Sequence, residues 1–130
     1  MPGQSPQILL IEGDRTLLEI TAFRLELLGY DVVTVDTAER ALDWLVGQLP
    51  TLVVVDYVLP GIDGIEFINR LSNDTRTSDI PVLFLSTNGD LEDVQKAYNA
   101  GADEYLVIPY DPMVLEAKIE RLASAITQTA

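Results

Sequence analysis

Residues 8–11 read Ile8-Leu9-Leu10-Ile11, an uninterrupted apolar run that is followed at once by Glu12-Gly13-Asp14. A short apolar run without alternating polar residues is typical of a strand that is buried on both faces. Such strands occur in parallel sheets that are covered by helices on both sides. The run therefore predicts an inner strand of a parallel sheet, with polar residues at its carboxyl end.

Further apolar runs of this kind occupy residues 32–35, 52–55, 82–85 and 105–108. The segments between them carry apolar residues at helical spacing. Strands that alternate with helices imply a parallel sheet with helices on both faces, and right-handed crossovers leave few topologies. We expect an α/β fold with a doubly wound five-stranded parallel sheet in the order 2-1-3-4-5, a flavodoxin-like (βα)5 sandwich.

Several residues predict where the helices begin and end. Thr37 and Asp111 are good N-caps, and Pro112 suits the first position of the last helix. Gly29 and Gly101 are placed to end the first and fourth helices. The last helix is expected to turn these apolar residues inward: Val114, Leu115, Ile119, Leu122 and Ile126.

The 130 residues are the length of one ordinary domain. We expect a flexible tail over 1–6, the domain over 7–126, and a C-terminal tail or the start of a linker over 127–130. The first residues have no basic region, and no apolar stretch is long enough to span a bilayer, so we expect no signal peptide, no membrane segment and a cytoplasmic location.

The composition excludes several kinds of site. With 8 Lys plus Arg against 21 Asp plus Glu, the net charge is −13, which disfavours direct binding to nucleic acids or anionic membranes. The chain has no Cys and no His, so it has no thiol nucleophile, no phosphohistidine and no Cys or His metal ligand. Any metal must bind oxygen ligands, which points to Mg²⁺ or Ca²⁺.

Polar residues follow the predicted strands where a functional site is expected. Ligands of open parallel sheets bind beyond the carboxyl ends of the strands, where the strand order reverses. Glu12 follows the first strand, Asp56 ends the third, and Ser86 follows the fourth. The sequence therefore predicts that these oxygen-bearing side chains converge on one crevice.

Two carboxylates in one crevice either raise one another's pKa or hold a cation. With a hydroxyl nearby, they suit phosphoryl transfer to a carboxylate, since an ionised Asp is itself a nucleophile. Each acid alone is more often structural than catalytic, and the combination at strand ends is the specific signal. Asp14 has two interpretations: the N-cap of the first helix, which Asp favours, or a further metal ligand.

Over residues 7–125 the chain resembles the CheY-like receiver domain of two-component response regulators. The matching segments are Ile8-Leu9-Leu10-Ile11-Glu12, Asp56-Tyr57-Val58-Leu59-Pro60-Gly61-Ile62-Asp63-Gly64, Ile80-Pro81-Val82-Leu83-Phe84-Leu85-Ser86 and Gly101-Ala102-Asp103-Glu104-Tyr105. The Asp-x-x-x-Pro-x-x-Asp-Gly segment is the most specific of them.

The resemblance implies roles for particular residues. Asp56 corresponds to the phosphoacceptor, and Glu12 to one of the acids that hold Mg²⁺. Val58 corresponds to the position whose backbone carbonyl also faces the metal. Ser86 corresponds to the hydroxyl that follows the phosphoryl group, and Tyr105 to the switch aromatic.

Two positions depart from the family pattern. Gly13 stands where a second acid is usual, and Ile108 where a Lys precedes the Pro. Fewer carboxylates attract Mg²⁺ less, and the missing Lys removes a charge-assisted contact to the phosphoryl group. Because no fixed cation lies beside Glu12 and Asp56, one of them is expected to titrate above its usual value. The Ile108–Pro109 bond is left open between cis and trans.

We therefore interpret the chain as an atypical receiver domain in a phosphorelay, with weak or altered phosphorylation of Asp56 and weak Mg²⁺ binding. It is not an enzyme beyond self-phosphotransfer from a phosphodonor. Its expected partners are a sensor histidine kinase or phosphodonor and an output protein or fused domain.

The alternative is a phosphorylation-independent interaction module that dimerises through the face of the fourth helix, fifth strand and fifth helix. A flavin carrier is disfavoured because Glu12-Gly13-Asp14 would repel a phosphate.

Overall fold

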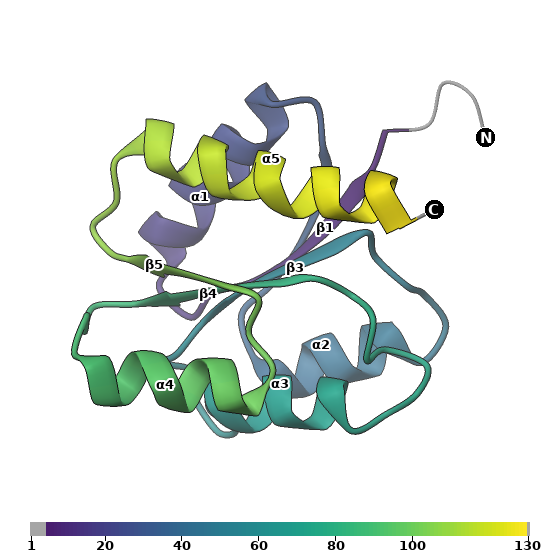
Figure 1. The fold of residues 1–130 in the computed structure, drawn as a ribbon, viewed down its shortest axis with the longest axis vertical. Coiled ribbons are helices and arrows are strands. Elements are labelled where there is room, and N and C mark those ends of the chain that lie inside the picture. The colour runs from purple at the N-terminus through teal and green to yellow at the C-terminus, as the bar shows by residue number, and fades with distance from the viewer. Residues whose placement is uncertain (1–4, 130) are drawn as a thin grey trace.

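The structure is a computed structural model that describes residues 5–129, and for residues 126–129 it describes the backbone alone. Strands and helices alternate along the whole described chain (Figure 1). The strands are β1 (Gln7–Ile11), β2 (Asp31–Val35), β3 (Leu52–Asp56), β4 (Val82–Ser86) and β5 (Glu104–Val107). The helices are α1 (Arg15–Leu27), α2 (Ala38–Leu45), α3 (Gly64–Ser72), α4 (Leu91–Ala100) and α5 (Pro112–Thr129).

The strands form one parallel sheet in the order β2-β1-β3-β4-β5, which confirms the predicted fold. In register, Ile11 pairs with Val55 and Asp56 pairs with Leu85, so β1, β3 and β4 end at the same edge. The strand order reverses between β1 and β3, because β2 lies beyond β1 and β4 lies beyond β3. The crevice expected from the sequence therefore opens at this edge.

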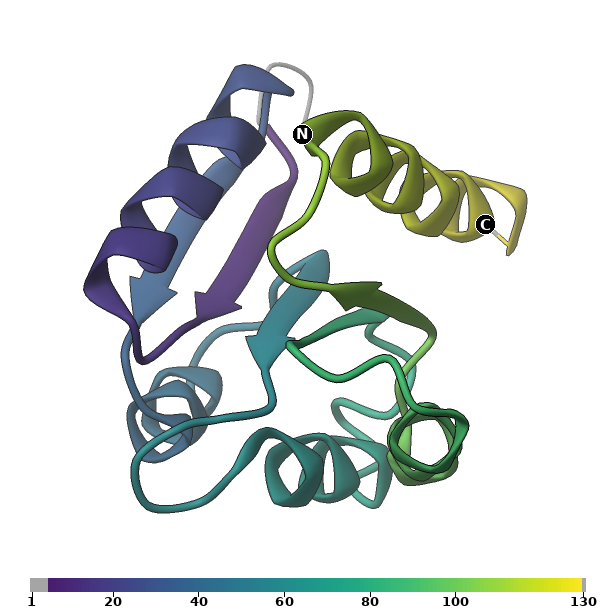
Figure 2. The same cartoon turned by 90° about the vertical axis from the view of Figure 1, so that its left-hand side faces the viewer.

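Helices cover both faces of the sheet, as Figures 1 and 2 show. Helices α1 and α5 lie on one face, and α2, α3 and α4 lie on the other. Successive residues of β1 and β3 point to opposite faces, so Leu9 and Val53 enter one core, while Ile8 and Leu52 enter the other. This two-sided burial explains why these strands read as continuous apolar runs.

The helix ends agree with the sequence signals. Thr37 accepts a hydrogen bond from the Arg40 N–H at 3.0 Å, and Asp111 accepts one from the Met113 N–H at 2.8 Å. Gly29 and Gly101 adopt φ angles of 98° and 131°, which other residues rarely adopt. The helix boundaries are thus set by local hydrogen bonds and backbone freedom.

Some boundaries and orientations differ from expectation. Val114, expected to point inward, has 41% of its surface exposed, because Leu115 and Ile119 occupy the face of α5 that meets the sheet. The side chain of Ile126 lies outside the described residues. Strand β5 ends at Val107, so Ile108 belongs to the following loop. None of the described helices is both long enough and apolar enough to cross a bilayer.

Candidate functional site

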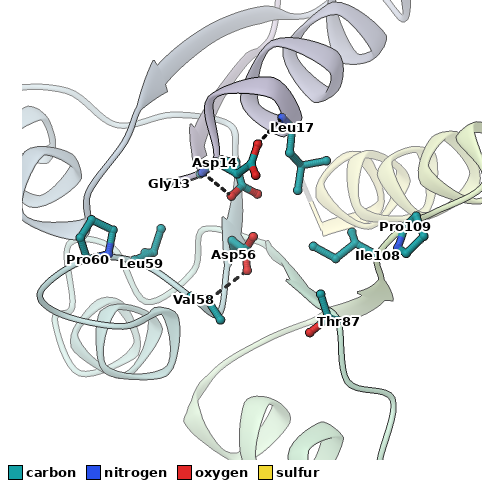
Figure 3. A pocket seen from close by; sticks show the side chains of 11 residues that line it. Gly13, Asp14, Leu17, Asp56, Val58, Leu59, Pro60, Thr87, Ile108 and Pro109 are labelled. Carbon is teal, nitrogen blue, oxygen red and sulfur yellow. Dashed lines mark hydrogen bonds between the residues drawn. The ribbon is translucent and has the colours of Figure 1, made fainter.

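The acids predicted at the strand ends lie together. Glu12 and Asp56 are 1% and 6% exposed, and both line one pocket of about 840 Å³ (Figure 3). The pocket lies beyond the carboxyl ends of β1 and β3, at the point where the strand order reverses. Its lining residues are Glu12, Gly13, Asp14, Leu17, Asp56, Val58, Leu59, Pro60, Thr87, Ile108 and Pro109.

The backbone holds one oxygen of each buried carboxyl. The Asp14 N–H donates to Glu12 Oε2 at 3.0 Å, and the Val58 N–H donates to Asp56 Oδ1 at 3.0 Å. Both donors lie two residues beyond the acid, so the turn after each strand orients the carboxyl. The other oxygen of Glu12, Oε1, is buried and has no hydrogen-bond partner.

Burial raises the pKa of the Glu12 carboxyl from its ordinary value of 4.5 to about 8. The hydrogen bond that a protonated Glu12 can make with Asp56 adds to the rise, and so does the Asp56 charge, while the Asp14 N–H opposes it. A proton on Glu12 would allow that hydrogen bond to form and would remove the repulsion between two buried anions. The expectation that one acid of the pair titrates high is thus confirmed for Glu12.

Asp14 acts as a helix cap. Its Oδ1 accepts a hydrogen bond from the Leu17 N–H at 2.9 Å, at the N-terminus of α1. Asp14 also lines the pocket, but this carboxylate oxygen is used by the helix. The sequence left two interpretations open for Asp14, and this hydrogen bond supports the helix cap.

The two positions that depart from the family pattern, Ile108 and Gly13, have different surroundings in the site. Figure 3 shows the Ile108 side chain pointing toward Asp56, and only 7% of it is exposed. An apolar group therefore occupies one side of the crevice. A Cβ on Gly13 would lie 3.2 Å from Pro60 Cδ, so an acid at this position would require Pro60 to shift slightly. The Ile108–Pro109 peptide bond is cis.

Ser86 and Tyr105 meet at Asn88, in the loop between β4 and α4. Ser86 Oγ accepts a hydrogen bond from the Asn88 N–H at 3.1 Å, and the Tyr105 hydroxyl donates to the Asn88 carbonyl oxygen at 2.5 Å. The Tyr105 ring is buried and packs on Phe84, with ring centroids 5.7 Å apart. Thr87, rather than Ser86, lines the pocket.

A divalent cation finds a partial ligand set here. Glu12 Oε1 is an unpartnered buried oxygen beside Asp56, which suits a hard cation that keeps several waters. The Val58 carbonyl oxygen faces the loop after β1, 3.8 Å from where a Cβ on Gly13 would lie. Among the described residues, no group of three or more acids is arranged to hold a metal ion.

Sequence reasoning missed some residues of the site. Asn88 carries a weak signal, since Asn88-Gly89 is a turn dipeptide directly after Ser86-Thr87. Leu17 and Leu59 carry none, because an apolar pocket wall and a core residue look alike in a sequence.

Comparison with known proteins agrees with the fold. The family described as "Response regulator receiver domain" matches residues 8–120. The chain is 36% identical over 123 residues to the DNA-binding dual master transcriptional regulator RpaA of Synechocystis, covering 90% of this chain and 48% of that protein. It is 34% identical over 124 residues to the phosphate regulon transcriptional regulatory protein PhoB of Escherichia coli, covering 95% of this chain and 54% of that protein.

The chain thus spans about half the length of these curated relatives. Among solved structures, a CheY-like receiver domain protein from Methanospirillum hungatei matches with a TM-score of 0.86 at 27% identity, covering 96% of this chain and 99% of that one.

Proposed function

The chain belongs to the response regulator receiver domain family of two-component signalling, and from that premise we propose that Asp56 accepts a phosphoryl group inefficiently. The observation that carries the proposal is the Asp56 carboxylate, whose Oδ1 is held by the Val58 N–H at the end of β3 while the side chain lines an open pocket. The second oxygen is then the nucleophile. It forms a bond to phosphorus as the bond from phosphorus to the donor's leaving group breaks.

Three features make this acceptor slow. The residues that line the pocket include no Lys or Arg, so no side chain of the pocket neutralises an incoming phosphoryl group. Asp14 adds negative charge that repels an anionic donor, and Glu12 adds more once it has lost its proton. Ile108 places a methyl-bearing side chain where a donor of charge-assisted hydrogen bonds would help.

Receiver domains generally use Mg²⁺ for phosphorylation. In this chain Glu12, Asp56 and the Val58 carbonyl would hold it, and the ion would supply positive charge to the phosphoryl oxygens. Two carboxylates in place of three predict weak binding.

Phosphorylation would be read out by Ser86 and Tyr105. Both are joined to Asn88 by hydrogen bonds, so a movement of Ser86 toward a phosphoryl group at Asp56 would alter the loop that also holds Tyr105. In this proposal the signal passes to the face made by α4, β5 and α5. A sensor kinase or small phosphodonor supplies the group, and an output protein or fused domain receives the signal; the proposed location is the cytoplasm.

Phosphodonor labelling tests this proposal. The chain is incubated with acetyl phosphate and Mg²⁺, and intact mass is followed for one added phosphoryl group. We expect slow, partial addition in the wild type and none in Asp56→Asn. Ile108→Lys is expected to react at least about tenfold faster, the effect of one charge-assisted contact. No adduct in the wild type, or the same adduct in Asp56→Asn, would overturn the proposal.

A second candidate is an interaction module that pairs without phosphorylation. Apolar side chains are exposed on all three elements of the α4–β5–α5 face, with Leu91 73%, Val107 43% and Met113 76% exposed. Exposed apolar side chains on neighbouring elements favour protein contact. In the first candidate the signal depends on phosphorylation of Asp56. In the second candidate the chain pairs with another copy without any phosphodonor.

A further inference from the structure

We propose that the pocket beside Asp56 binds an organic ammonium ion, a protonated primary amine carried on an apolar body. This inference rests on the same site as the proposed function and names a ligand class for it. It follows from the combination of a large apolar wall with a buried, unpartnered carboxylate oxygen.

The pocket has the size and lining of a small-molecule site. Its volume of about 840 Å³ lies within the range of roughly 300–1,000 Å³ that such sites occupy. Leu17, Leu59, Ile108 and Pro109 supply apolar walls from three separate segments of the chain. Figure 3 shows Ile108 and Pro109 on one side of Asp56, and Leu59 and Pro60 on the other. The apolar body of a ligand would lie between these walls.

The polar end of the pocket lacks a donor. Glu12 Oε1 is buried without a hydrogen-bond partner, in a residue that is 1% exposed and that lines the pocket. A buried acceptor without a partner is costly. Without a ligand, a proton on Glu12 that is shared with Asp56 relieves this cost, and an ammonium group would take the place of that proton. Asp56 supplies a further acceptor at the same end. An ammonium group carries three donors and no acceptor, which matches this set.

Other ligand classes fit less well. An anionic ligand would meet Glu12, Asp14 and Asp56 with no Lys or Arg among the lining residues. A bare metal ion would use the carboxylates but leave the apolar walls in contact with water. An organic cation satisfies both halves of the pocket, because its head pairs with the acids while its body covers Leu17 and Ile108.

Probe binding to the whole chain tests the inference. Benzylammonium is titrated into the protein in the presence of a chelator, and backbone amide shifts are followed by NMR. Benzyl alcohol has nearly the same body without the charge, and methylammonium has the same head without the body. We expect benzylammonium to shift the amides of Gly13, Val58 and Thr87 and to bind at least about tenfold more tightly than either comparison probe.

Two variants and one control sharpen the result. Glu12→Gln removes the unpartnered carboxylate at nearly constant shape and should weaken benzylammonium binding at least about tenfold. Ile108→Lys brings an ammonium of the chain itself into the pocket and should abolish binding. Val46→Lys adds the same charge at a side chain that is 79% exposed and outside the pocket, and should leave binding unchanged.

Equal binding of benzyl alcohol and benzylammonium, or shifts confined to other surfaces, would overturn the inference even if a variant fails to fold. Failure here leaves the phosphodonor result untouched, since acetyl phosphate labelling is measured without amine. A phosphoryl adduct on Asp56 together with no benzylammonium binding would therefore retain the proposed function and reject the ligand.

Discussion

Among the described residues, Glu12 is the one with a buried side-chain oxygen that lacks a hydrogen-bond partner, while its other oxygen accepts from the Asp14 N–H. The cost of ionising it is expressed in a pKa near 8. Since Asp56 lines the same pocket, the charge state of Glu12 decides how much negative charge an incoming ligand meets.

This pKa predicts how stability depends on pH. The folded chain keeps the Glu12 proton between about pH 4.5 and 8, where the unfolded chain has released it. Folding then takes up a proton, so the free energy of unfolding falls as pH rises through this window, by at most about 1.4 kcal/mol per pH unit from this group. Urea denaturation at a series of pH values, in chelator, measures the slope.

In Glu12→Gln this fall should be absent, whereas Glu116→Gln, which removes an exposed acid from α5, should keep it. A wild-type slope equal to that of Glu12→Gln would mean that Glu12 ionises normally in the folded chain.

The backbone at Asp56 passes so close to Gly64, at the start of α3, that this position leaves no room for a side chain. A Cβ at this position would overlap the carbonyl oxygen of Asp56 and lie 2.9 Å from Tyr57 Cα. We expect Gly64→Ala to lower the free energy of unfolding by about 1–3 kcal/mol, the usual cost of overpacking. Urea denaturation measures this loss.

The matched control is Gly47→Ala, because a Cβ on Gly47 would meet nothing within 4 Å. Its change should stay within about 0.5 kcal/mol. Equal effects of the two substitutions would show that the close approach of Gly64 to Asp56 is tolerated.

At the scale of elements, the β4–α4 loop is held by one side chain. The Asn88 amide donates to Asp93 Oδ2 at 2.7 Å, and its oxygen accepts from the Asp90 N–H at 2.8 Å. The backbone of Asn88 also forms hydrogen bonds with the Ser86 and Tyr105 hydroxyls. The loop therefore couples the end of β4, the start of α4 and the aromatic on β5.

Asn88→Ala should free this loop while the sheet stays intact. The substitution removes two side-chain hydrogen bonds that contribute about 0.5–1.5 kcal/mol each, so we expect a loss of about 1–3 kcal/mol in total. Amide hydrogen exchange should accelerate at Asp90 and remain unchanged in β1 and β3. Asn99→Ala removes an exposed Asn from α4 and should change neither quantity. Unchanged exchange at Asp90 would contradict the role of Asn88.

At the scale of the whole molecule, the exposed apolar side chains gather on more than one surface. Leu91, Val107 and Met113 belong to α4, β5 and α5, and β5 is also an edge strand. Phe23, which is 58% exposed, lies on α1. This helix lies beside β1 and β2, away from the β5 edge of the sheet (Figure 2). The net charge of −13 opposes association of two copies, so an apolar contact must offset that repulsion.

If the interaction-module candidate is correct, the chain dimerises without a phosphodonor. Sedimentation over a concentration series should then show a dimer that Val107→Glu weakens at least about tenfold, because it buries a charge in an apolar contact. Phe23→Glu, with the same change of charge on α1, should leave the dimer unchanged. A monomer at all concentrations would reject pairing through this face.

The sequence by itself determined the fold, because it follows from local patterns. Buried parallel strands read as apolar runs, and helix ends carry caps such as Thr37 and Asp111. Strand ends in such a sheet share an edge, so the meeting of Glu12 and Asp56 could also be predicted. The family resemblance then added the roles of Ser86 and Tyr105, which stay predictions until phosphorylation is measured.

Only the tertiary structure decided how deeply Glu12 is buried and which of its oxygens lacks a partner. It also decided that Ile108 and Leu17, from opposite ends of the chain, wall one pocket, and that Asn88 joins Ser86 to Tyr105. The physical reason is that periodicity and capping involve residues close in sequence. Desolvation, unpaired hydrogen bonds and pocket walls depend on which distant side chains pack together.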